Sequence, residues 1–148
     1  MEDLLRQNFK KEQIDGYFCQ KCQKNVAATK SQLIVEVPPI LVIHVSRLLG
    51  FGSHHKASHP IDYPLTSLNL GEFVDKKNEK KPDEIEFDLV AVVAHFGVAN
   101  KGHYVAYCWN DQVDSWLEYN DLKVRQITGK HLLDATRETA HMLIYERR

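Results

Sequence analysis

Residues 87–121, FDLVAVVAHFGVANKGHYVAYCWNDQVDSWLEYND, decide the fold of this chain. The stretch opens with an apolar run at 89–94, passes through a glycine-containing loop and enters a second run at 103–109. A turn at 110–114 then leads into a third run. Valine-rich and aromatic runs separated by Gly, Asn and Asp are typical of antiparallel strands joined by short turns. We therefore expect a continuous antiparallel sheet here.

The same stretch carries polar residues at its strand ends. His103 begins the second strand, and Asn120 and Asp121 end the third. Adjacent antiparallel strands can bring an imidazole beside a carboxamide, which is how cysteine and serine hydrolases hold a base and its orienting group. The pattern predicts half of a catalytic site.

The rest of the chain shows the sequence patterns of further short helices, strands and loops. Leu4, Leu5 and Phe9 share one face of an expected helix at 3–11. We expect strands at 29–37, 40–45, 123–127 and 140–145, a helical turn at 130–133, and exposed polar loops at 49–60 and 75–84. The β-branched run at 40–45 predicts a central, buried strand. The whole indicates an α+β fold made mostly of antiparallel sheet.

The amino-acid composition limits the classes of function that are possible for this chain. The 148 residues, 43% hydrophobic and 26% charged, are enough for one globular domain with a real core. A net charge of -1 predicts no nucleic-acid partner. We expect no membrane segment, because no apolar run approaches about 20 residues. The charged N-terminus is unlike a signal peptide, and 3 cysteines suit a reducing compartment, the cytoplasm or the nucleus.

Two of the cysteines, Cys19 and Cys22, form a CxxC motif. This spacing brings two thiolates to one point, as tetrahedral zinc requires, but zinc needs four ligands. The loop histidines His54, His55 and His59 are the nearest further candidates, and a solvated loop is the favoured interpretation for them. A redox CxxC is the alternative. We therefore predict at most half of a zinc site.

Ordered motifs along nearly the whole chain resemble the C-terminal half of the ubiquitin-specific protease catalytic domain. They are FCQKC with PPILVIHVSR inside 18–47, IDYPLTSLNLGEFV at 61–74, the histidine box at 87–110, SWLEYNDLKV at 115–124 and the terminal ETAHMLIYERR. That family comprises papain-like cysteine peptidases, which cleave after the C-terminal glycine of ubiquitin. The resemblance implies that 1–148 is part of one catalytic domain, with a zinc-knuckle remnant at 17–30 and a palm at 31–148.

The resemblance also implies residue roles. His103 corresponds to the general base, Asn120 to the residue that orients it, and Asp121 to a second acidic position. Gly102, Tyr104 and His95 correspond to positions beside the substrate tail. Ubiquitin or a ubiquitin-like modifier would be the partner. AHFGVANKGHY and the ETA ending look most like the interferon-induced member that removes a ubiquitin-like modifier.

The main departure from the family is the nucleophile. The family's cysteine box precedes the segments matched here, so the N-terminal half of the catalytic domain is a further expected partner. Cys108 lies five residues past His103, on the opposite face of the same strand. We keep two hypotheses open: part of a cysteine-type deubiquitinase, or an inactive pseudo-protease that binds ubiquitin or regulates. A small zinc-ribbon nucleic-acid binder is a weaker third, given the neutral charge.

Overall fold

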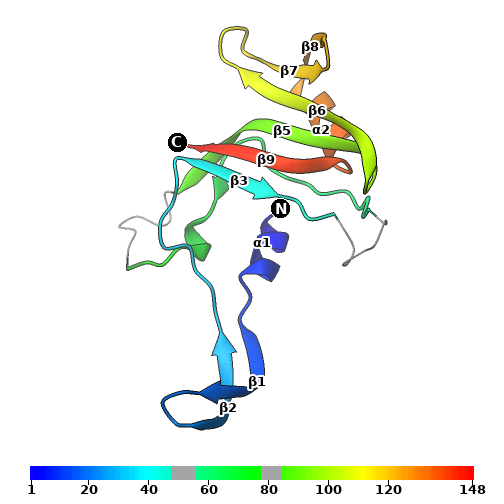
Figure 1. Ribbon diagram of the computed structural model, residues 1–148. Helices are drawn as coiled ribbons and strands as arrows, with labels where there is room; N and C mark the ends of the chain where they lie inside the picture. Colours follow the sequence, from blue (N-terminus) through cyan, green and yellow to red (C-terminus); the bar gives the residue numbers. More distant parts are fainter. Residues whose placement is uncertain (48–55, 78–84) are drawn as a thin grey trace. The chain divides into compact units, whose positions relative to one another are not determined.

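The computed structural model describes residues 1–47, 56–77 and 85–148 (Figure 1). These residues form two compact units, Met1–Val37 with Leu70–Glu84, and Pro38–Asn69 with Ile85–Arg148. Most of the predicted loops at 49–60 and 75–84 lies outside the described residues. The expected division into a knuckle at 17–30 and a palm at 31–148 stays a prediction.

The first unit consists of a helix, a hairpin and a short 3-10 turn. Its elements are α1 (Glu2–Asn8), β1 (Glu12–Cys19), β2 (Lys24–Lys30) and η1 (Gly71–Phe73). β1 pairs antiparallel with β2 (Figure 1). Cys19 is the last residue of β1, and Cys22 lies in the turn between the two strands. The helix was predicted at about this place. Strand β1 was not, because its residues are nearly all exposed and show no apolar alternation.

The strand predicted at 29–37 is wrong. Beyond β2, and within the part of the chain that the structure describes, only Ile34 of this stretch makes a ladder-type contact, a parallel bridge to Val74. Its amide donates to Phe73 O and its carbonyl accepts from Asp75 N, both at 2.8 Å. Leu33 and Val35, expected on the same side of the strand, are 54% and 63% exposed. The alternation is real, but no partner strand takes up the other backbone groups.

The second unit is built on one antiparallel sheet in the order β3-β9-β5-β6-β7-β8, with β4 paired to β5 (Figure 1). The elements are β3 (Ile40–His44), β4 (Leu68–Asn69), β5 (Glu86–Val98), β6 (Lys101–Asn110), β7 (Ser115–Asn120), β8 (Lys123–Ile127), α2 (Gly129–Thr136) and β9 (Ala140–Arg147). The architecture confirms the predicted α+β class. Of the described helices, none is long and apolar enough to cross a bilayer.

The strand predicted to be central, 40–45, is instead the end strand of this sheet. Among the described strands β3 pairs only with β9, and Ile40, Val42 and His44 are exposed. The prediction rested on composition alone. An apolar β-branched run is equally compatible with an edge strand whose side chains are exposed. The terminal strand β9 takes the central place between β3 and β5.

One face of the sheet forms the core of the second unit. Val92, Tyr107, Leu143 and Tyr145 on this face are each less than 5% exposed. Helix α2 packs on β7, and the Thr128 side chain caps it by accepting from the His131 amide at 3.2 Å.

The opposite face is apolar but only partly covered by the described residues. Strand alternation and the cross-strand register place nine uncharged side chains on it. They are half-buried or exposed in this chain: Val42, Ala91, Val93, Ala106, Cys108, Leu117, Tyr119, Met142 and Ile144. An antiparallel sheet that met water on this side would carry polar residues there.

Arg47, only 5% exposed, anchors the chain beyond β3. Its guanidinium donates to four backbone carbonyls, those of Ala140 at 2.9 Å, Ala57 at 3.1 Å, His59 at 2.9 Å and Arg137 at 2.9 Å. Burial lowers the pKa of Arg47, and a nearby carboxylate, that of Glu138, partly opposes the shift. One side chain therefore satisfies carbonyls from segments that share no ladder.

Replacing Arg47 by Met should lower the free energy of unfolding by about 3 kcal/mol, because buried carbonyls would lose their donors. Urea denaturation followed by circular dichroism measures this. Arg6→Met is the matched control, since Arg6 contacts three carboxylates but is exposed and should change stability little. Equal effects of the two changes would contradict the anchoring role.

Candidate active site

The predicted base and its orienting group meet in the structure. His103 on β6 and Asn120 at the end of β7 lie on neighbouring strands, and His103 Nε2 is 2.8 Å from Asn120 Oδ1. An amide oxygen only accepts, so Nε2 carries the proton and donates to it. Nδ1 is then the ring nitrogen that can accept a proton from a thiol.

Asp121 stands next to this pair without joining it closely. Its Oδ2 is 3.9 Å from His103 Nε2, and its side chain is 78% exposed. The residue has a φ of 52°, in the left-handed region, within the turn that joins β7 to β8. Asp tolerates this conformation better than most residues. The turn therefore holds a carboxylate near the His103 ring.

Gly102, one residue before His103, has no room for a side chain. A Cβ there would fall on His95 Nε2 and on the Phe96 carbonyl, and within 2.9 Å of His95 Cε1. The His95 ring thus occupies the space that glycine leaves open. Gly97, opposite Gly102 in the ladder, has a φ of +119°, and a Cβ there would lie 2.6 Å from the Lys101 carbonyl. These two glycines allow the strands to approach.

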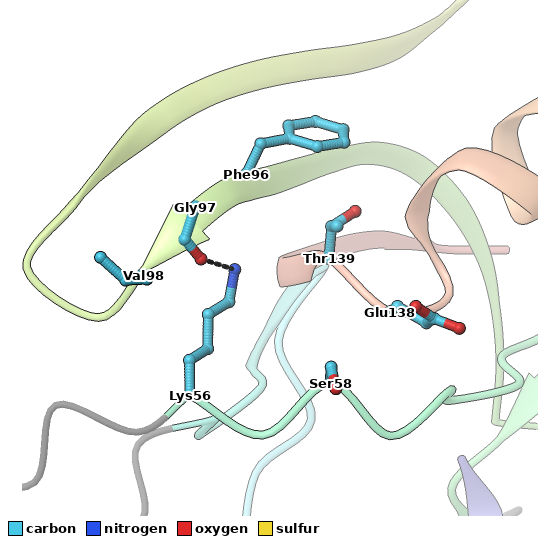
Figure 2. Close-up of a pocket in the computed structure, with 7 residues that line it drawn as sticks. All are labelled: Lys56, Ser58, Phe96, Gly97, Val98, Glu138 and Thr139. Atoms are coloured by element: carbon cyan, nitrogen blue, oxygen red, sulfur yellow. Dashed lines mark hydrogen bonds between the residues drawn. The ribbon is translucent and has the colours of Figure 1, made fainter.

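Lys56 fixes the tip of β5. Its ammonium group donates to the carbonyl of His95 and, at 3.5 Å, to that of Gly97. Burial, and next the charge of Arg47, lower its pKa. Figure 2 shows Lys56 reaching the Gly97 oxygen. The side chain stands at the wall of a cavity of about 350 Å³ that is lined by Lys56, Ser58, Phe96, Gly97, Val98, Glu138 and Thr139.

Next to Gly102 lies a cluster of aromatic rings that the sequence analysis did not predict. His95 packs on Tyr104 with ring centroids 4.6 Å apart, and His141 lies 5.8 Å from Tyr104 and 6.4 Å from His95. His141 in turn contacts His44 edge-on at 4.7 Å. Four rings from four strands meet here. Sequence spacing gives no signal of it, because only the strand order brings these residues together.

The cysteines occupy two different settings. Cys108 is on β6, half-buried, and burial raises the pKa of its thiol. The pKa of Cys19 is lowered by hydrogen bonds from the backbone of Cys22 and of Lys21. Such a thiolate suits zinc, and the turn offers two donors of the four that zinc needs. Among the described residues, no group of three or more potential metal ligands was found.

The sequence matches the family model "Ubiquitin carboxyl-terminal hydrolase" over residues 1–145. Among curated proteins, the chain is 30% identical over 133 residues to "Ubiquitin carboxyl-terminal hydrolase cyk-3" of Caenorhabditis elegans. That match covers 88% of this chain and 10% of the relative.

Solved structures give the same assignment. The SAGA Ubp8/Sgf11/Sus1/Sgf73 DUB module bound to ubiquitin aldehyde aligns with a TM-score of 0.82 at 29% identity, over 100% of this chain and 33% of that one. The yeast SAGA DUB module with an Sgf73 variant aligns at 0.75 and 27%, over 99% and 32%. The chain spans about a third of these structures. This chain belongs to the ubiquitin carboxyl-terminal hydrolase family.

Proposed function

We propose that this chain supplies the base and its orienting residue to a cysteine-type deubiquitinase. The supporting observation is the 2.8 Å contact between His103 Nε2 and Asn120 Oδ1 at the ends of two paired strands. An imidazole held in this tautomer is ready to take a proton at Nδ1. The reaction is hydrolysis of the peptide or isopeptide bond after the C-terminal glycine of ubiquitin or of a ubiquitin-like modifier.

The chemistry follows from this half-site. His103 accepts the proton of a cysteine thiol, and the thiolate attacks the carbonyl carbon of the terminal glycine. The imidazolium returns the proton to the departing amine, leaving a thioester. His103 then takes a proton from water, and the hydroxide attacks the thioester carbonyl and releases the modifier. The imidazolium returns its proton to the departing sulfur, which regenerates the thiol. Asn120 keeps the ring oriented throughout, and Asp121 favours its charged form.

The nucleophile in this proposal comes from a partner, the N-terminal half of the catalytic domain. Cys108, five residues along β6 from His103, points to the opposite face. The partly covered apolar side chains on one face of the sheet support such a partner, because exposed apolar patches are typical of interfaces. The solved relatives are about three times longer than the matched segment.

Substrate, metal and compartment complete the proposal. Ubiquitin is the first candidate, because a solved relative is bound to ubiquitin aldehyde. A ubiquitin-like modifier is the second, because AHFGVANKGHY is similar to the interferon-induced member's segment. Gly102, Tyr104 and His95 would lie beside the modifier's tail. Cys19 and Cys22 would hold zinc together with two ligands from the partner, and the protein would act in the cytoplasm or nucleus.

The runner-up function is an inactive module that binds ubiquitin or regulates a partner. The placement of the cysteines favours this function. Cys19 and Cys22 belong to the CxxC motif, and Cys108 lies on the face of β6 opposite to His103. The two proposals differ in one measurable way. The first needs turnover when the chain is joined to a nucleophile-bearing half, whereas the second needs ubiquitin binding without turnover.

In a catalytic domain that contains this chain and a nucleophile, His103→Ala should lower kcat/KM on the order of a thousandfold, because the thiol loses its base. Asn120→Ala should cause a smaller loss, since the ring is still present but less well oriented. Cleavage of a fluorogenic ubiquitin C-terminal amide measures both. Negligible effects of both changes would overturn the assignment of the base.

The chain alone should form no covalent adduct with ubiquitin that carries a C-terminal vinyl electrophile, because no cysteine is presented to His103. Mass spectrometry after incubation measures this, and iodoacetamide serves as the control that the thiols are reduced. The modifier of the interferon-induced system should be tested in parallel. A specific adduct with either probe would contradict the need for a partner.

A further inference from the structure

The ring cluster behind His103 has a structural cause in strand β9. Opposite Val93 lies Met142, but opposite Ala94 lies Ala140, so His141 is an extra residue in the β9 ladder with β5. Such a bulge re-aims the side chain that it contains. It directs the His141 ring toward His44, Tyr104 and His95. The Val45 amide donates to the His141 carbonyl at 2.9 Å and fixes the bulge from β3.

His95 links this cluster to the site. Its backbone is held on both sides, because its amide donates to Thr139 O at 2.9 Å and its carbonyl accepts from Lys56. The residue is only 7% exposed, and its ring lies directly against the Cα of Gly102, where a side chain would otherwise be. Gly102 is bonded to His103. A shift of the His95 ring would therefore displace the backbone that carries the base.

We propose that His95 and His141 are positioning residues for His103: the His141 ring supports the His95 ring, which sets the Gly102–His103 backbone. The inference rests on the proposed role of His103. It goes beyond that role, because it assigns a function to the bulge and to a histidine that touches neither the base nor Asn120. It also predicts a dependence on pH that the base alone does not produce.

The charges around the cluster favour neutral rings. Burial lowers the pKa of His95, and the Lys56 ammonium adds to the effect. Burial likewise lowers the pKa of His141. Electrostatic repulsion from the neighbouring His44, His95 and Lys56 lowers it further. The groups that face His141 are thus His44 from β3, His95 from β5, Tyr104 from β6 and Lys56 from the segment before β4.

The sign of the pH effect follows. A histidine has an ordinary pKa of about 6.5 in the unfolded chain, and both rings have lower values in the folded one. The unfolded state therefore binds more protons as the pH falls through 6.5, so stability is lost on acidification. Above this pH the rings are neutral in both states and the penalty is absent.

The first test is thermal unfolding of the 148-residue chain at pH 7.5 and 5.5. Tm should fall on acidification, and His141→Phe, which keeps an aromatic ring without the titration, should remove roughly half of that fall. His59→Phe is the matched control, because His59 is an exposed histidine outside the cluster; its fall should equal that of the unchanged chain. A fall in His141→Phe as large as that of the control would overturn the proposal.

The second test reads the position of Gly102 itself. In a His103→Ala background, which removes the titration of that ring, the Gly102 amide resonance should move between pH 7.5 and 5.5. Adding His141→Phe should reduce this movement by half or more. An unchanged movement would overturn the proposal. Neither readout uses turnover, so a failure of the proposed enzymatic function would be seen separately, in the His103→Ala activity measurement.

Discussion

The second unit depends on the four hydrogen bonds that Arg47 donates. They join the start of β9, the end of α2 and the extended segment at 57–59, none of which is paired with another through a strand ladder. A buried guanidinium is well suited to this, because its planar fork of donors is always charged and matches several carbonyls at once. The segments that it joins border the β5 tip: Lys56 comes from one, and Thr139, which accepts from His95, from another.

The candidate site is consequently built on strands and not on free loops. His103 and Asn120 come from β6 and β7, and the rings next to Gly102 come from β3, β5, β6 and β9. In the proposed enzyme such fixed placement would matter, because a small displacement of a base is costly in rate.

The sequence predicted the sheet from 86 to 120, the α+β class and the contact between His103 and Asn120. Each of these depends on local alternation and on strands that are adjacent in sequence. It failed where the outcome depends on distant partners. The 40–45 run looks central by composition, yet strand order places it at the edge. Leu33 and Val35 alternate as in a strand, yet only Ile34 finds a backbone partner. His141 and Lys56 gave no signal, because a bulge and a long-range carbonyl contact bring them to the site.

The double proline before β3 has a consequence for assembly. β3 is five residues long and is the last strand of the described sheet on its side, so its outer row of amides and carbonyls is open to another strand. Pro38 and Pro39 have no amide hydrogen to donate, so an incoming strand gains no donor there. The edge that could pair with another strand is therefore confined to the five residues of β3. The two prolines thus act as a gatekeeper against edge-to-edge aggregation.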